Sequence, residues 1–275
     1  MPGPSIAVVH LIRKANGIEP FAQFLVSYRR HADPTDHDLV LIFKDFKADE
    51  DAPFLSLLGD VAYKRYDFAG DGGLDIGPYV AVANDLKYDY FCFLNSFSQI
   101  EGDNWLTFLF NALTTAPQAG IVGATGSWES SGALDPPFPN IHVRSNGFMM
   151  SSACLQQMSF IDIRDKEDAR AMESGPNSFT QQVRDQGKKP YLVDRYGTVW
   201  AEADWPQSAT FRSGRQAGLM ISDNRTRAFE LGDDWTREYL YDMAWTGKPS
   251  SANPFKRHKL RHRLRRLIQP KRPQR

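Results

Sequence analysis

Short, nearly continuous apolar runs recur along the first half of the chain, and segments with helical spacing of apolar residues separate them. The runs lie at residues 5–12 (SIAVVHLI), 38–43 (DLVLIF) and 88–94 (YDYFCFL). Apolar runs of this length without polar alternation are typical of strands buried on both faces. The helical segments lie at residues 19–31, 54–58, 75–86 and 105–113. Strands that alternate with helices predict an α/β fold with a mostly parallel sheet and helices on both faces.

The second half of the chain is less regular. Patterns are visible at residues 130–140 (a loop rich in proline and small residues), 141–151 and 191–196 (strands). Glu173 opens a segment that we expect to continue as a helix to about Gln186. Residues 205–227 mix charged and aromatic side chains without a clear period, and no structure is predicted for them.

The chain has 275 residues, enough for one large α/β domain with a sizeable core. We expect a single domain over residues 1–250, followed by a basic tail over 251–275. Residues 256–275 hold ten of the 33 Lys and Arg side chains and no acidic one. The remaining body has 23 basic side chains against 33 acidic ones. This distribution argues against a nucleic-acid-binding core, and no nucleic-acid partner is expected.

The basic tail also carries apolar residues that fall near one helical face between residues 255 and 268. A basic amphipathic helix can lie on an anionic membrane surface, and a solvated C-terminus is the alternative. Cys92 and Cys154 stand in apolar runs, which favours a reducing compartment over a disulfide framework. The sequence shows no signal segment and no apolar stretch near the roughly 20 residues that cross a bilayer. We expect a cytoplasmic protein, with the tail as a candidate contact to the inner face of the cell membrane.

The most informative segment is residues 88–106, which read YDYFCFLNSFSQIEGDNWL. A hydrophobic strand that ends in Asn95–Ser96 and is followed by Trp105–Leu106 resembles the centre of GT-A glycosyltransferases. More specifically, it resembles bacterial family-2-like enzymes of surface-polysaccharide synthesis. Further motifs agree in order: GLDIGPY at 73–79, GIVGATGSW at 120–128, HVRSNGF at 142–148, ESG at 173–175 and DNRTR at 223–227.

The resemblance covers roughly residues 5–230 and implies a GT-A (Rossmann-like) domain. It implies transfer of a sugar from a nucleotide-sugar donor to a glycan or lipid-linked acceptor, with inversion at the anomeric carbon. The alternative from another class is a non-catalytic protein that keeps the GT-A fold and binds sugar nucleotides or glycans.

The chain departs from the family at the end of this strand. Typical GT-A enzymes carry Asp-x-Asp there, because carboxylate oxygens hold Mg²⁺ or Mn²⁺ against the donor's diphosphate. Here Asn95, Ser96 and Phe97 occupy the motif. The replacement weakens the expectation of a divalent metal, for which Asn95 and Asp103 remain the candidate ligands.

Ligands of parallel sheets bind outside the carboxyl ends of the strands. Charged and polar residues at these ends are therefore candidates for donor binding: Arg13, Lys44, Asn95 and Ser96. Asp75 and Gly77 are further candidates, because the glycine-rich segment that contains them can place backbone N–H groups beside a phosphate or ribose. Arginine and lysine can offset the charge of a diphosphate when no metal is present. Solvated loop charges are the alternative interpretation of Arg13 and Lys44, and a polar turn is that of Asn95–Ser96.

Glu173 is the candidate catalytic residue. Inverting sugar transfer needs a carboxylate that takes the proton of the acceptor hydroxyl, and the resemblance gives this role to an acid at the start of a helix. The alternative is an acid favoured there by the helix dipole. The candidates for acceptor binding are Trp128, Glu129, His142, Arg144 and Asn146, the last three being expected on one face of a strand. A core tryptophan and an exposed sheet face are the alternatives.

Overall fold

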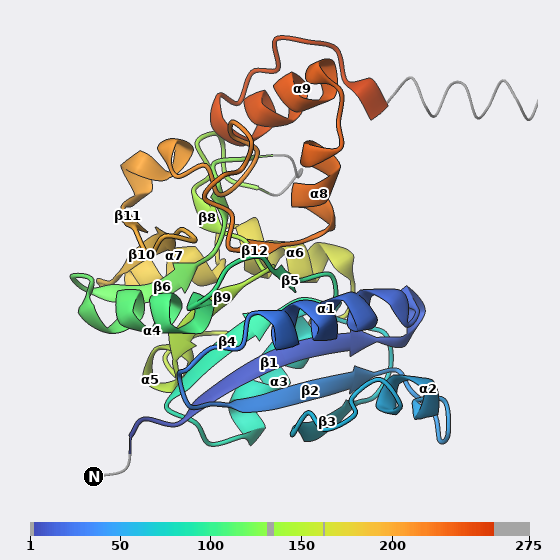
Figure 1. Cartoon of the computed structure of the whole chain (residues 1–275). Coiled ribbons are helices and arrows are strands. Elements are labelled where there is room, and N and C mark those ends of the chain that lie inside the picture. Colours follow the sequence, from blue (N-terminus) through green and yellow to red (C-terminus); the bar gives the residue numbers. More distant parts are fainter. Residues whose placement is uncertain (1–2, 131–134, 162, 256–275) are drawn as a thin grey trace, which may run out of the picture.

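The computed structural model describes residues 3–130, 135–161 and 163–255, and its centre is one eight-stranded sheet flanked by helices (Figure 1). The strand order is β11-β10-β6-β9-β4-β1-β2-β3. These strands are β1 (Ile6–Arg13), β2 (Asp38–Lys44), β3 (Lys64–Phe68), β4 (Tyr90–Leu94), β6 (Ala119–Gly123), β9 (Phe148–Ser151), β10 (Lys189–Val193) and β11 (Val199–Trp200). The α/β class predicted from the sequence is confirmed.

The three apolar runs form the centre of the sheet. β1 pairs in parallel with both β2 and β4, and all of its residues except Arg13 are buried. β3 continues the parallel order at one edge. On the other side, β9 runs antiparallel between β4 and β6, which makes the sheet mixed, and β10 is again parallel to β6. Parallel pairs still outnumber antiparallel ones within the described sheet.

Two groups of helices cover the two faces of the sheet, and alternate strand residues belong to two separate cores. Val8 of β1 packs with α1 and α4, whereas Ala7 and Val9 pack with α3, α6 and α7. Figure 1 shows α1 and α3 on opposite sides of β1. The helices are α1 (Glu19–Arg30), α2 (Ala52–Leu55), α3 (Ile76–Asp85), α4 (Trp105–Thr115), α5 (Ser152–Leu155), α6 (Lys166–Ser174), α7 (Phe179–Asp185), α8 (Asn224–Glu230) and α9 (Asp234–Trp245), with 3₁₀ turns at η1 (Lys14–Asn16) and η2 (Glu202–Gln207).

Two small antiparallel pairs bring later segments to the carboxyl ends of the central strands. β5 (Gln99–Ile100) pairs with β12 (Ile221–Ser222), so the start of α8 lies close to the end of β4. β7 (Gly126–Ser127) pairs with β8 (His142–Val143). These pairings place residues that are far apart in the sequence around one edge of the main sheet.

The structure corrects two expectations in the second half. Glu173 lies in the last turn of α6, not at the start of a helix, because Asp165 caps α6 eight residues earlier and the chain leaves the helix at Gly175. The strand expected over 141–151 is divided into β8 and β9 by a turn. Arg144 and Asn146 therefore do not continue the face of His142.

The boundary at residue 250 stays a prediction, and the proposed tail helix lies outside the described residues from 256 onward. Within the described part of the chain, the helices are all too short or too polar to cross a bilayer.

Candidate functional site

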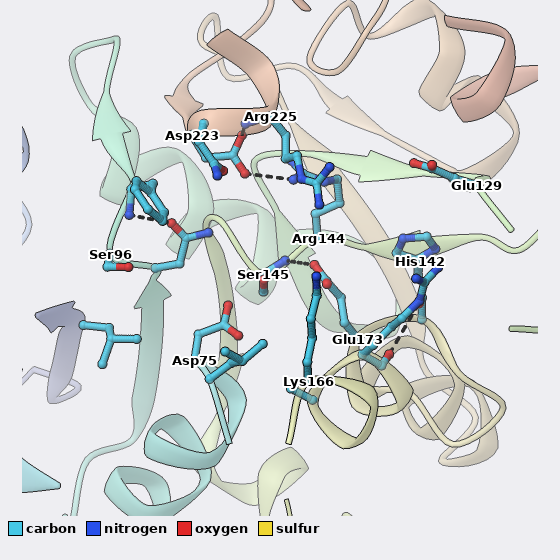
Figure 2. Close-up of a pocket in the computed structure, with 18 of the residues that line it drawn as sticks. Asp75, Ser96, Glu129, His142, Arg144, Ser145, Lys166, Glu173, Asp223 and Arg225 are labelled. Atoms are coloured by element: carbon cyan, nitrogen blue, oxygen red, sulfur yellow. Dashed lines mark hydrogen bonds and ion pairs between the residues drawn. The ribbon is translucent and has the colours of Figure 1, made fainter. Parts of the chain in front are cut away.

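A cavity of about 350 Å³ opens at the carboxyl ends of β1 and β4. Its lining comes from the ends of these strands, the start of α3, the inner side of α6 and the segments around β8 and the start of α8. Figure 2 shows side chains from all of these elements pointing into one space. This is the edge at which ligands bind in parallel α/β sheets.

One side of the cavity carries two carboxylates, Asp75 and Glu173, which we call the carboxylate wall. Asp75 directly precedes α3, and Glu173 projects from α6, which is anchored in the core by Ala169 and Met172. Ser145, in the turn between β8 and β9, contacts both acids. Its backbone N–H donates to Glu173 Oε1 at 2.8 Å, and its side chain forms a hydrogen bond with Asp75. Figure 2 shows Ser145 between the two acids.

The pKa of Asp75 departs from its ordinary value. Burial and the nearby charge of Glu173 raise the pKa of Asp75 to about 6, while hydrogen bonding to the Ser145 side chain opposes this rise. A carboxyl group with such a pKa exchanges protons close to neutral pH.

The opposite side carries an arrangement that we call the arginine wall: Arg144, Phe211, Arg212 and Arg225. The Phe211 ring contacts two guanidinium groups, with Arg144 Cζ 4.2 Å and Arg212 Cζ 4.7 Å from the ring centroid. Cation–π contacts of this kind become stronger where the cation is desolvated. Arg225 is exposed at the rim of the cavity.

Each buried arginine of the wall has a carboxylate partner from a distant segment. Arg144 Nη2 donates to Asp223 Oδ2 at 2.8 Å, and Arg212 Nη1 donates to Glu129 Oε2 at 3.0 Å. Burial opposes ionisation of Asp223, yet its pKa lies below the ordinary value because Arg144 and the backbone N–H groups of α8 stabilise the anion. Burial lowers the pKa of Arg212 to about 10, so this arginine is still a cation at neutral pH.

The end of β4 forms a neutral turn. Asn95 Oδ1 accepts hydrogen bonds from the Phe97 N–H at 2.9 Å and from the Ser98 hydroxyl at 3.2 Å. Ser96 Oγ accepts from Asn16 Nδ2 at 2.6 Å. Both side chains line the cavity, but their oxygens already accept protein hydrogen bonds.

These residues do not fit a divalent ion of the Asp-x-Asp kind. Mg²⁺ and Mn²⁺ are held by hard, mostly anionic oxygens, and the strand end offers an amide and a hydroxyl. Asp103 lies away from the cavity lining and pairs with His31 at 2.7 Å. Across the described ranges, His, Cys, Asp and Glu side chains form no group of three or more suited to a metal.

The structure places the other donor-side candidates at different depths. Arg13 lines the cavity and forms a forked ion pair with Asp71. Lys44 is fully buried behind the lining and donates to the Leu74 carbonyl at 2.5 Å, and this burial lowers its pKa to about 8. Because it donates to Leu74, Lys44 supports the loop that precedes Asp75. Gly77 lies in the first turn of α3, also outside the lining.

The acceptor-side candidates also divide. Glu129, His142 and Arg144 line the cavity, and burial lowers the pKa of His142, so its imidazole is neutral at physiological pH. Trp128 packs edge-on against Trp245, at 5.8 Å between ring centroids, outside the lining. Asn146 is fully buried and donates to the Ile221 carbonyl at 2.8 Å, which ties the turn after β8 to β12.

Several lining residues escaped the sequence interpretation: Ser145, Lys166, Phe211, Arg212 and Arg225. Phe211 and Arg212 lie in the stretch without periodicity, where the backbone of Ala209, Arg212 and Gln216 is left-handed, with φ of 52°, 44° and 50°. Such non-glycine residues are uncommon and mark a constrained loop. The signal that could have identified Phe211 and Arg212 is the presence of aromatic and basic residues together in a segment without periodicity.

No protein-family model matches the sequence, and no curated protein matches it. Similar solved structures include TarS of S. aureus, with a TM-score of 0.46 and 12% identity over 74% of this chain and 38% of that chain. GalNAc-T7, solved with UDP, GalNAc and Mn²⁺, gives 0.45 and 14% over 69% and 42%. The 4-diphosphocytidyl-2C-methyl-D-erythritol synthase of Anaerococcus prevotii gives 0.44 and 11% over 70% and 89%.

GT-A glycosyltransferases are among the structures to which the chain is similar. The chain spans less than half the length of TarS and of GalNAc-T7. These TM-scores lie below 0.5, and the α/β fold is that of the observed eight-stranded sheet.

Proposed function

We propose that this protein is a glycosyltransferase that moves a sugar from a nucleotide-sugar donor to a glycan or lipid-linked acceptor, as in bacterial surface-polysaccharide synthesis. The observation that carries the proposal is the position of the Glu173 carboxylate. It faces a cavity at the carboxyl ends of the parallel strands, held by the Ser145 N–H, opposite a cationic wall. Sugar transfer requires a base that takes the proton of the acceptor hydroxyl. It also requires positive charge that stabilises the departing diphosphate.

Glu173 takes the proton from the acceptor hydroxyl as the hydroxyl oxygen attacks the anomeric carbon. The bond between that carbon and the diphosphate oxygen breaks, and its electron pair stays on the diphosphate. Attack from the face opposite to the leaving group inverts the anomeric carbon. The hydrogen bond from Ser145 fixes one oxygen of Glu173 and leaves the other for the proton.

We assign the donor to the part of the cavity lined by Arg13, Asp75, Asn95 and Ser96, at the ends of β1 and β4 and the start of α3. The acceptor then lies toward Glu129, His142 and Arg144, with Glu173 between the two parts. Such an arrangement lets one carboxylate contact the acceptor hydroxyl beside the reacting carbon.

The test is Glu173→Gln, which keeps the size and the hydrogen bond to Ser145 but removes the base. We expect release of nucleoside diphosphate from the preferred donor to fall by at least about 100-fold, while calorimetric donor affinity changes less than about threefold. Glu167→Gln is the matched control, because Glu167 is exposed on the same helix and does not line the cavity. Unchanged turnover in Glu173→Gln would remove Glu173 from the mechanism.

A second candidate function is non-catalytic binding of sugar nucleotides or glycans, favoured by the neutral end of β4 where family members carry acids. Donor panels that bind to the wild type without any release of nucleoside diphosphate, in EDTA and with Mn²⁺, would establish this function instead.

The basic tail carries a separate proposal, contact with an anionic membrane surface. Deletion of residues 256–275 should reduce co-sedimentation with vesicles that contain phosphatidylglycerol. Equal sedimentation of the full and shortened chains would reject it.

A further inference from the structure

The arginine wall holds more hydrogen-bond donors than the protein uses. A guanidinium group has five N–H donors. Arg144 directs two of its nitrogens to Asp223 and Thr125, at 2.8 and 3.4 Å. Arg212, which is 5% exposed, bonds only to Glu129 through its side chain, and its Nε is buried without a partner in the described structure.

The acceptors of this wall are already occupied. Asp223 Oδ1 accepts the N–H groups of Arg225 and Thr226, and Oδ2 accepts Arg144. The side chain of Arg225, at the rim, makes no hydrogen bond or ion pair with the described residues. A buried N–H group without a partner is costly, and Arg212 Nε is such a group. The donors of Arg144, Arg212 and Arg225 that the protein does not use are available to acceptors from outside it.

The shape of the wall is fixed in advance. Both guanidinium groups pack on the Phe211 ring, and Arg212 is held in a left-handed backbone conformation at φ 44°. Guanidinium groups held in place form forked hydrogen bonds to the oxygens of phosphate or carboxylate. Across the cavity, the carboxylates of Asp75 and Glu173 accept hydrogen bonds. An anionic group of the substrates would therefore bind at the arginine wall, and a hydroxyl group would bind at the carboxylate wall.

We infer that the arginine wall binds an oxyanion of the substrate pair directly, without a divalent metal. The inference rests on the proposed glycosyltransferase function and names its anion site. Where the oxyanion is the donor's diphosphate, the electron pair of the broken sugar–oxygen bond remains on it, and guanidinium N–H groups stabilise that charge without a proton transfer. The oxyanion comes either from the donor's diphosphate or from a phosphate or carboxylate group of the acceptor.

Titration calorimetry tests this site with the full-length protein in EDTA. The probes are UDP, GDP, dTDP and CDP for the donor, and glucose 1-phosphate and glucuronate for an anionic acceptor. Arg225→Gln removes an exposed guanidinium and should weaken binding of the oxyanion about tenfold. Arg215→Gln, an exposed arginine outside the cavity lining, should leave it unchanged.

The pattern of losses identifies the source. Weaker binding of one nucleoside diphosphate to Arg225→Gln, with equal affinity in EDTA and Mn²⁺, assigns the wall to the donor. Weaker binding of glucose 1-phosphate or glucuronate, with unchanged nucleoside diphosphate, assigns it to the acceptor. Binding that requires Mn²⁺, or that is equal in Arg225→Gln and wild type for every probe, overturns the inference.

Loss of turnover in Glu173→Gln together with normal binding in Arg225→Gln would reject the anion site and leave the glycosyltransferase function intact. The opposite combination would keep an anion-binding site and reject Glu173 as the base.

Discussion

The two walls of the cavity are held in place by different means. The carboxylate of Asp75 lies directly before helix α3 and that of Glu173 projects from helix α6, and Ser145 is their shared contact. The arginines depend on ion pairs between segments about 80 residues apart, Arg144 with Asp223 and Arg212 with Glu129. Glu173 receives a single hydrogen bond from the backbone, whereas each buried arginine depends on a carboxylate from a distant segment. The carboxylate wall should therefore be chemically sensitive and the arginine wall structurally sensitive.

The largest expected contrast compares Asp223→Ala with Glu173→Gln in urea unfolding. Asp223 is buried, caps α8 and pairs with Arg144. Its removal leaves a largely buried guanidinium unpaired and should cost about 3–5 kcal/mol of the free energy of unfolding. Glu173→Gln should cost less than about 1 kcal/mol, although we expect it to reduce turnover at least about 100-fold. Equal losses of stability in the two variants would show that the walls do not differ in this way.

The control for Asp223→Ala is Asp103→Asn, which removes the exposed member of the His31 pair outside the cavity. Exposed pairs contribute little, so the change should stay within about 0.5 kcal/mol.

The second contrast is Asp75→Asn against Asp36→Asn, measured as the free energy of unfolding at pH 4, 5 and 7.5. Burial and Glu173 raise the pKa of Asp75 from 3.8 to about 6. Between these values the folded protein binds the proton more tightly than the unfolded chain, so stability falls as pH rises through this window. Asp75→Asn should remove the fall and stabilise the protein by up to about 3 kcal/mol at pH 7.5. Asp36 is exposed, and its replacement should preserve the wild-type slope.

The sequence predicts those parts of the site that local patterns determine, and it does not predict those that depend on contacts between distant segments. The central strands could be predicted because an apolar run is a local signal, and Arg13, Asp75, Asn95 and Glu173 follow from their positions in those patterns and motifs. The helix containing Glu173 was misplaced, since its start is set by the Asp165 cap rather than by the motif. Arg212 was missed because its contacts to Glu129 and Phe211 carry no periodicity.

The smallest expected effect concerns the backbone behind the arginine wall. Ala209 is left-handed at φ 52° and does not line the cavity. Since glycine adopts this conformation without the strain of an alanine, Ala209→Gly should raise the free energy of unfolding by a few tenths to about 1 kcal/mol. The same substitution in helix α8, Ala228→Gly, should lower it by about 1 kcal/mol. Thermal denaturation distinguishes the two signs, and destabilisation by Ala209→Gly would refute a strained loop.

The β5–β12 pairing has a consequence for the order in which the molecule folds. It joins residues 100 and 221, and so closes a loop of about 120 residues before Asp223 and Arg225 can reach the end of β4. Closing so long a loop is slow and entropically costly compared with pairing β1, β2 and β4. We expect the sheet to form first and the complete cavity last. A nucleotide bound there would accordingly slow unfolding while leaving the refolding rate unchanged.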